Sequence, residues 1–580
     1  MLLIRFTACL LLTATLAIAV KPAKRRTAKP ASKTTGVSAV PKWVRGMTLR
    51  DEVAQLIVVP FSGQPLNPRT KAYREFKKLV AHDHVGGMIL VNVTQGRLVQ
   101  KAEPLAVASF LNQMQRFAKV PLLVSADLER GASMRLNATT VFPHAMAFAA
   151  AQDPGAARME GEVTAREARA VGIHWVFYPV ADVNNNPDNP IINIRSFGEN
   201  PVEVSKYVDA FIEGAHADKK NLVLTTAKHF PGHGDTSTDS HMNLATITAD
   251  RERLNRVEFA PFRSAIEHGV DSIMTAHIAV PALDDSGVPA TLSPKILTGI
   301  LREQMGFKGI IVTDALEMGG IAKGYKQGEA SVRAIEAGAD VLLMPSDPHA
   351  AIEGVLAAVK SGRITKQRLD ASVARLLTAK LRVGLGTQST VDLERVSEIL
   401  NSPESNAAAQ AVADKAVTVV KGAAQFVPLR DATKTCFLAL TEGRTSPQGQ
   451  AFLAEVRRRV PGAHAALLDS QMTAEDVAAN DQQNQGCDTT VVAAFVSVAA
   501  YRGNVALGGV YPGLMERLIG SGKPVVLVSL GNPYLLRNFS GVGGYLTTYS
   551  TVPPSEIAAV KVLFGEIAAT GKLPVTIPGF

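Results

Sequence analysis

The stretch Lys228-His229-Phe230-Pro231-Gly232-His233-Gly234-Asp235-Thr236-Ser237-Thr238-Asp239-Ser240-His241 directly follows an apolar, strand-like run at 221–227. Gly and Pro interrupt regular structure, so the pattern predicts a strand that ends in a polar loop. The loop concentrates three His, two Asp and one Lys in fourteen residues. Loops held on a rigid scaffold commonly carry chemistry, and we therefore expect a functional site here.

Three interpretations of this loop are open. A polar surface loop with hydrogen-bonded histidines is the simplest. A metal site would use His229 and His233, but a four-residue spacing puts two ligands on one face only in a helix, and Pro231 lies between them. The third interpretation is acid–base chemistry, since the Asp239 carboxylate can accept the N–H of His241, fix its tautomer and raise its basicity. We favour the third.

Strand-like and helical segments alternate from about residue 50 to 350. Apolar strands that alternate with helices are typical of a parallel sheet covered on both faces, and eight such units predict a (β/α)8 barrel of the TIM type. The eight expected strands are 55–60, 87–91, 121–127, 174–182, 222–229, 271–277, 309–314 and 339–345. Helical periodicity is clearest at 154–171, 202–217, 251–268, 294–305, 329–337 and 350–385.

Polar residues cluster where these strands end. Barrel enzymes carry their active sites on the face formed by the carboxyl ends of the strands, so convergence of several polar ends on one rim favours function over packing. The residues concerned are Asp127, Asp182, Lys228, His229, His277 and Asp314.

The chain is expected to hold several segments. We predict a signal peptide at 1–20, a basic disordered linker at 21–44, the barrel at 45–385, a linker at 386–406 and a smaller α/β sandwich domain at 407–580. Residues 1–33 hold seven basic and no acidic residues, so removing them takes the formal charge from +9 to +2. The nearly neutral body gives no reason to expect nucleic-acid binding.

Export is the localisation we predict, to the periplasm or the cell exterior, with no integral membrane segment after signal removal. Cys436 and Cys487 can pair in an oxidising compartment, but two buried free thiols are an equal alternative. We expect no cofactor and no metal, and we favour a monomer.

Asp314 is the candidate nucleophile because it ends the strand-like run Gly309-Ile310-Ile311-Val312-Thr313. A structural aspartate is an equal alternative on this signal alone, and the Asp–His pair on another loop favours the nucleophile. In a retaining glycosidase a carboxylate attacks the anomeric carbon, and a second group protonates the leaving oxygen and then deprotonates water. That second group is usually a carboxylic acid, and a His held by an Asp can perform the same task near neutral pH.

Several spaced motifs resemble the β-N-acetylhexosaminidase branch of glycoside hydrolase family 3, the NagZ-type enzymes. They are Lys-His-Phe-Pro-Gly-His-Gly with Asp-Ser-His, Val312-Thr313-Asp314-Ala315-Leu316-Glu317-Met318, and the loop from Asn189 to Gly198. The resemblance implies that Asp314 is the nucleophile and that His241, paired with Asp239, is the acid/base. It implies sugar-binding roles for Asp127, Arg195, Lys228, His229 and His277.

The sequence departs from the family pattern after the third strand. The family reads Asp-x-Glu-Gly-Gly-x-Val, and here Arg130 replaces the first Gly and Ser133 the Val. A long cation beside the mouth could change which leaving group fits. The β-glucosidases of the same family resemble this architecture but lack the Gly-His-Gly…Asp-Ser-His loop. The presence of that loop here favours the acetamido-sugar branch.

We therefore expect an exo-acting retaining β-N-acetylglucosaminidase that releases terminal β-GlcNAc from peptidoglycan fragments or chitin-type oligosaccharides. Two alternatives are kept: a β-glucosidase-like glycosidase of the same family, and a catalytically silent protein that binds sugar or cell wall. The second domain is expected to be structural or to shape the substrate site.

Overall fold

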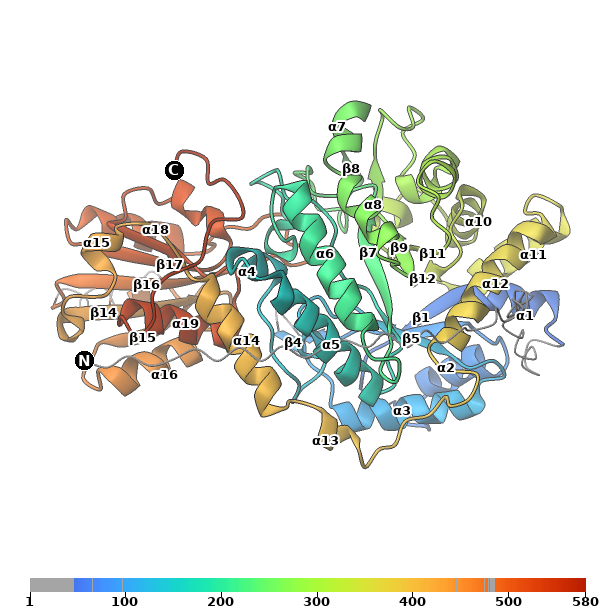
Figure 1. Cartoon of the computed structure of the whole chain (residues 1–580), viewed down its shortest axis with the longest axis horizontal. Coiled ribbons are helices and arrows are strands. Elements are labelled where there is room, and N and C mark those ends of the chain that lie inside the picture. Colours follow the sequence, from blue (N-terminus) through green and yellow to red (C-terminus); the bar gives the residue numbers. More distant parts are fainter. Residues whose placement is uncertain are drawn as a thin grey trace, which may run out of the picture. The chain divides into compact units, whose positions relative to one another are not determined.

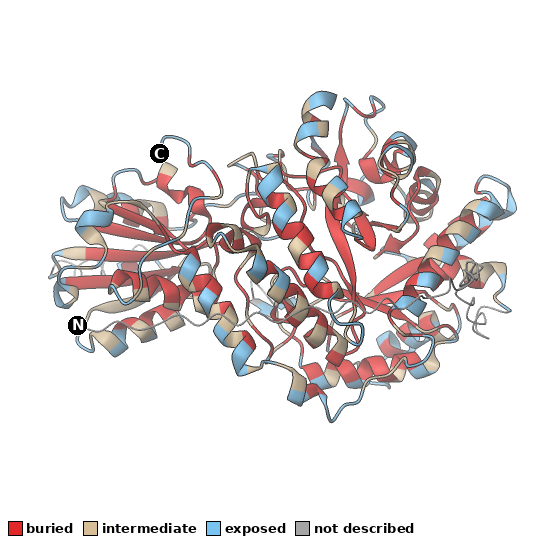
Figure 2. Ribbon diagram, viewed as in Figure 1, coloured by how far each residue is buried: buried red, intermediate tan, exposed pale blue. Residues whose placement is uncertain are grey.

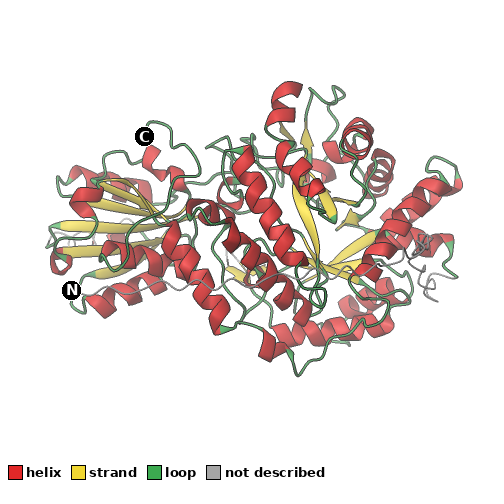
Figure 3. Cartoon of the chain, viewed as in Figure 1, coloured by secondary structure: helices red, strands yellow, loops and turns green. Residues whose placement is uncertain are grey.

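The computed structural model describes residues 46–580 apart from 65, 96–97, 444–445, 474, 478 and 480–485. The predicted signal peptide and basic linker lie outside the described residues. Residues Gly46–Phe580 form one compact unit, in which strands and helices alternate along the chain (Figures 1 and 3).

The first sheet contains all eight expected barrel strands. Its order is β11-β9-β7-β6-β5-β2-β1-β12, with every pairing parallel. The ring closes between its two end strands, where Thr313 N donates to Val341 O (3.0 Å) and Leu316 N to Leu343 O (2.9 Å). The strands are β1 (Ile57–Phe61), β2 (Gly87–Leu90), β5 (Leu123–Ala126), β6 (Trp175–Val176), β7 (Leu224–Phe230), β9 (Ser272–Thr275), β11 (Ile310–Thr313) and β12 (Leu342–Leu343). The predicted barrel is confirmed.

One apolar cluster fills the barrel interior and draws on all eight strands, for example Val58, Leu123 and Trp175. Helix α12 (Lys366–Arg382) adds Leu376 and Ala379 to the same cluster. Figure 2 shows the strands almost wholly buried and the helices exposed along one side. Burial of apolar side chains is the main favourable term in folding. The polar residues at the strand ends are not part of this apolar cluster, and they are the barrel residues that can take part in chemistry.

Helices flank the strands as expected, with local differences. The helix predicted at 251–268 is two helices, α7 (Arg251–Arg256) and α8 (Ala260–Glu267), because Pro261 lacks the N–H that a continuous helix needs. The segment Lys295–Gln304 is a π-helix, in which Met305 N reaches back to Ile300 O. The other barrel helices are α1 (Leu49–Gln55), α2 (Lys71–Ala81), α3 (Pro104–Phe117), α4 (Ala145–Ala150), α5 (Pro154–Ala170), α6 (Pro201–His216), α9 (Gly319–Ala322), α10 (Gln327–Ala337) and α11 (Pro348–Lys360).

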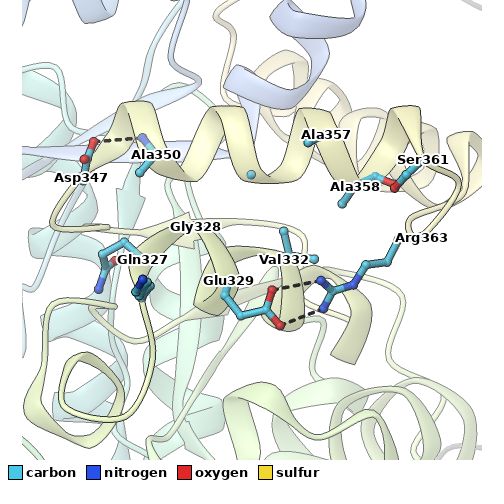
Figure 4. Close-up of a pocket in the computed structure, with 12 residues that line it drawn as sticks. Gln327, Gly328, Glu329, Val332, Asp347, Ala350, Ala357, Ala358, Ser361 and Arg363 are labelled. Atoms are coloured by element: carbon cyan, nitrogen blue, oxygen red, sulfur yellow. Dashed lines mark hydrogen bonds and ion pairs between the residues drawn. The ribbon is translucent and has the colours of Figure 1, made fainter.

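Helices α10 and α11 approach closely at Gly328 and Gly354, where a Cβ on either residue would lie within about 3 Å of the facing backbone. An open hollow of about 820 Å³ lies along this crossing, with the Glu329–Arg363 ion pair at its edge (Figure 4). None of the predicted site residues lines it.

Six apolar runs after residue 407 predict strands at 416–420, 436–440, 463–468, 489–496, 524–530 and 544–549. The second sheet has six strands that overlap these runs, in the order β13-β18-β17-β16-β14-β15. All pairs are parallel except β13 with β18. The strands are β13 (Thr418–Lys421), β14 (Thr435–Thr441), β15 (Ala465–Asp469), β16 (Thr489–Val496), β17 (Val525–Gly531) and β18 (Gly544–Thr547), with helices α14 (Pro403–Ala416), α16 (Gln450–Arg459), α18 (Tyr511–Gly520) and α19 (Pro553–Leu563). Cys436 and Cys487 form a disulfide, which decides the alternative left open by the sequence.

The segment expected to be a linker, 386–406, contains the short helix α13 (Val396–Ile399) and the first turn of α14, which begins at Pro403. One apolar cluster contains residues of both domains. Helix α4 of the barrel domain contributes Met146, Ala147 and Ala150, and the second domain contributes Tyr511 and Tyr549. Among the described residues, no helix is long and apolar enough to cross a bilayer.

Candidate active site

A buried ion-pair network lies at the ends of β5 and β7. The Lys228 Nζ atom is 2.8 Å from Asp127 Oδ1 and 2.7 Å from Glu129 Oε1. Glu129 also accepts two hydrogen bonds from Arg195, from Nε and Nη2, at 2.7 Å each. Arg135 Nη2 completes the network at 2.9 Å from Asp127 Oδ2. Three cations and two carboxylates are therefore fixed in one place by charge-assisted hydrogen bonds.

Charges in this network hold each other ionised. Burial would raise the pKa of Glu129, but Arg195 and Lys228 hold it well below its usual value. Burial would lower the pKa of Lys228, and the Asp127 and Glu129 carboxylates raise it instead. Because Lys228 is only 1% exposed, loss of either carboxylate would leave its buried charge only partly compensated.

His229 and His233 are held by hydrogen bonds within the protein. His229 Nδ1 lies 2.7 Å from Asp182 Oδ2, and the backbone N–H of His233 donates to Asp182 Oδ1 (2.7 Å). Both ring nitrogens of His233 are engaged, by Thr236 Oγ1 (2.9 Å) and Ser240 Oγ (2.8 Å). Among the described residues, no group of three His, Cys, Asp or Glu side chains is placed to hold a metal ion.

Two glycines allow the loop after β7 to turn back on itself. Gly232 has φ +117°, and a Cβ there would lie 2.8 Å from the Cβ of Glu258. Gly234 passes so close to the backbone that a Cβ would lie 1.7 Å from Val183 O. This path carries the loop from Lys228 in the ion-pair network to His241.

Asp239 and His241 form a hydrogen-bonded pair at the end of this loop. Asp239 Oδ1 accepts hydrogen bonds from His241 Nδ1 and from the His241 backbone N–H, both at 2.9 Å. The Asp239 side chain is 1% exposed and that of His241 is 23% exposed, so the imidazole can reach a substrate. Burial opposes ionisation of Asp239, but the hydrogen bonds from His241 lower its pKa below the ordinary value.

Asp314 follows β11 and is tied to the same loop through the backbone. Gly319 N donates to His241 O (3.0 Å), and Gly320 N donates to Ser240 O (3.3 Å). Burial would raise the pKa of Asp314, but the surrounding imidazoles of His229, His277 and His241 lower it. A partly exposed, ionised carboxylate therefore lies within electrostatic range of the acid–base pair.

His277, for which the resemblance implied sugar binding, has hydrogen-bond partners within the protein. The residue is fully buried, its Nε2 donates to Ala315 O (3.0 Å), and its Nδ1 lies 2.8 Å from Thr291 Oγ1. Both nitrogens are thus used inside the protein, one of them on the residue that follows Asp314. This geometry fits a residue that positions the Asp314 loop.

The structure also brings in residues that the sequence did not single out. Glu129 and Arg135 lie in the ion-pair network, and Asp182, noted only as a polar strand end, orients His229. Arg130 has Arg135 and Glu129 as its charged neighbours, and burial lowers its pKa to about 10. It therefore lies beside the ion-pair network, and its expected effect on the leaving group stays a prediction.

Comparison with known proteins identifies the family of this chain. Residues 48–379, more than half of the chain, match the model of the glycosyl hydrolase family 3 N-terminal domain. The chain is 30% identical to a β-hexosaminidase A of Pseudoalteromonas piscicida over 87% of this chain and 91% of the relative. It is 29% identical to a β-N-acetylglucosaminidase/β-glucosidase of Cellulomonas fimi, over 85% and 88% of the two chains.

A solved family 3 β-N-acetylglucosaminidase from Paenibacillus sp. str. FPU-7 superimposes with a TM-score of 0.81 at 34% identity, covering 92% of this chain and 99% of that one. The chain belongs to glycoside hydrolase family 3. It is a glycoside hydrolase of the β-N-acetylhexosaminidase type.

Proposed function

We propose that this protein is an exported, exo-acting, retaining β-N-acetylglucosaminidase with Asp314 as nucleophile and His241 as acid/base. The observation that carries the proposal is the pairing of His241 with Asp239 on a loop that is hydrogen-bonded to Gly319 and Gly320, five and six positions after Asp314. Two backbone hydrogen bonds thereby link the segment of the nucleophile to that of the acid/base.

The reaction has two steps. The Asp314 carboxylate attacks the anomeric carbon while the bond to the leaving oxygen breaks, and the Nε2–H of the His241 imidazolium gives its proton to that oxygen. In the second step His241 Nε2 takes a proton from water. The water oxygen then attacks the anomeric carbon and the bond to Asp314 breaks. Asp239 stays ionised throughout, so it stabilises the imidazolium before proton transfer and holds Nδ1–H afterwards.

We assign sugar binding to Asp127, Arg195, Lys228 and His229. Glu129 and Arg135 hold the first three in place through the ion pairs described above. In this assignment His277 acts through the backbone of Ala315 rather than on the sugar. Fixed charged donors and acceptors of this kind strengthen in a site from which water is excluded, which favours binding of hydroxyl groups at defined positions.

Terminal β-GlcNAc on peptidoglycan fragments or chitin-type oligosaccharides is the substrate we propose. Export agrees with the leader-like sequence at residues 1–20 and with the Cys436–Cys487 disulfide, since structural disulfides persist in oxidising compartments. A preference for glucosides is the competing candidate, because one similar protein is named for both activities.

Paired 4-nitrophenyl β-glycosides, the N-acetylglucosaminide and the glucoside, test the proposal in the presence of EDTA. We expect a clearly higher kcat/KM for the N-acetyl sugar and no effect of the chelator. A preference for the glucoside would overturn the assignment to the acetamido-sugar branch. Tight binding of chitooligosaccharides without turnover would instead support a catalytically silent protein.

A further inference from the structure

The loop between β16 and α18 belongs to the C-terminal domain but reaches the acid–base pair of the barrel. Tyr501, near its tip, packs its ring edge-on against the His241 imidazole, with the ring centroids 5.3 Å apart at 63°. The loop also passes Met242, because a Cβ on Gly503 would lie 3.7 Å from Met242 Sδ. A residue some 260 positions from the dyad is therefore part of its surroundings.

The loop is anchored on both sides of Tyr501. Next to it, the Arg502 guanidinium pairs with the Glu442 carboxylate at the end of β14, and Ser497 donates to the same carboxylate from N (3.1 Å) and Oγ (2.7 Å). Further along, Asn532 Nδ2 donates to Val505 O (2.8 Å). These bonds hold the loop against the C-terminal domain while its tip extends towards the barrel.

Tyr501 itself is held in an unfavourable state. Its φ is +65°, in the left-handed region that bulky side chains avoid, and 61% of the residue is exposed. Strained, exposed residues of this kind are concentrated at ligand sites, since packing gives no reason to keep them. Partial burial, together with the carboxylates of Glu317, Asp239 and Asp314, raises the pKa of its phenol, so the ring is uncharged at neutral pH.

We propose that Tyr501, together with Met242, forms a leaving-group subsite that takes the ring of a neutral sugar. The inference rests on the proposed function, in which His241 protonates the leaving oxygen, so that a group packed on His241 borders the departing sugar. An exposed aromatic ring offers an apolar face to the C–H groups of a pyranose, and Met242, 41% exposed, widens that surface. The C-terminal domain thus contributes to choosing the leaving group.

The test compares two substrates whose leaving groups need the same protonation. In N,N′-diacetylchitobiose the leaving group is a sugar ring, whereas in methyl β-N-acetylglucosaminide it is an alcohol with nothing to stack. For Tyr501→Ala we expect kcat/KM to fall about 5- to 10-fold for the disaccharide, as for loss of an aromatic contact. The methyl glycoside should stay within about twofold of wild type. Tyr501→Phe should behave like wild type on both substrates.

Equal losses on the two substrates would overturn the subsite and show instead that Tyr501 positions His241. An unchanged disaccharide rate would overturn the inference as well. Leu467→Ala, which removes an exposed apolar side chain elsewhere in the C-terminal domain, is the matched control and should leave both rates unchanged. Failure of the proposed function is distinguishable, because wild-type protein would then release no N-acetylglucosamine from either substrate.

Discussion

Replacing Asp239 by Asn tests the acid–base pair without changing its shape. The asparagine oxygen can still accept from His241 Nδ1 and from the backbone N–H, the two 2.9 Å hydrogen bonds of Asp239, so the loop should keep its path. What is lost is the negative charge beside the imidazole. Because the Asp239 side chain is 1% exposed, solvent screens this charge little.

The expected loss can be worked from that hydrogen bond. A hydrogen bond to a charged group contributes about 1.5–3 kcal/mol and one between neutral groups about 0.5–1.5 kcal/mol, so loss of the charge alone costs about 1–1.5 kcal/mol. The imidazolium that donates the proton should be destabilised by this amount. Because about 1.4 kcal/mol corresponds to a tenfold change in rate, we expect kcat/KM for chitobiose to fall about 5- to 13-fold.

The assay compares chitobiose with 4-nitrophenyl β-N-acetylglucosaminide, whose nitrophenolate leaves without protonation. kcat/KM is the useful quantity because it reports steps up to the first irreversible one. We expect the aryl substrate to lose less than about threefold. Asp235→Asn, the same change in the same loop at a residue paired with Arg253, is the control. Equal losses on both substrates would refute the acid/base role of His241.

Three further predictions concern the framework of the site and of the barrel. Glu129→Gln should lower the free energy of unfolding by about 3–5 kcal/mol in urea, because it removes a carboxylate from a buried ion pair; a loss below about 1 kcal/mol would contradict the network. Gly234→Ala should abolish folding or activity, because the new Cβ would lie 1.7 Å from Val183 O. A Cβ at Gly462 would have no heavy atom within 4 Å, so Gly462→Ala should change neither stability nor activity. Burial lowers the pKa of Lys380 from 10.5 to about 7, so wild-type stability should rise as the pH rises from 7 towards 10.5. Lys380→Met should flatten that dependence. The variant should be more stable than wild type by most at pH 6, where the gain is at most about 5 kcal/mol minus the contribution of the lost hydrogen bond to Gln55. An unchanged pH slope would count against the last prediction.

Most of the fold could be predicted because apolar runs and helical periodicity report local burial. All eight barrel strands and all six strands of the second sheet lie within or overlap the runs read from the sequence. Strand β6 is the weakest match, since only Trp175–Val176 pairs within a run expected to extend over 174–182. Pro179 has no N–H to give to a ladder, so the rest of the run bends into the rim with one isolated bridge, Val180 to Lys228.

The site was harder to predict, because much of it depends on contacts between distant segments. Asp239 and His241 are two residues apart, so their hydrogen bond could be anticipated. Arg195 and Glu129 are separated by 66 positions, and no spacing rule connects them. Tyr501 lies in another domain, and a single aromatic residue in a loop carries no signal of its own. The role expected for His277 did not account for its second hydrogen bond, to a backbone carbonyl that only the fold brings near.

Trapping of a covalent intermediate tests the central claim most directly. Incubation with a 5-fluoro N-acetylglucosaminyl fluoride, followed by intact-mass measurement and peptide mapping, should give a single sugar adduct on Asp314. The account predicts that this adduct is absent from Asp314→Ala protein and that β-N-acetylglucosamine is the first product anomer of the wild-type enzyme. An adduct on Glu317, or an α-configured first product, would contradict it.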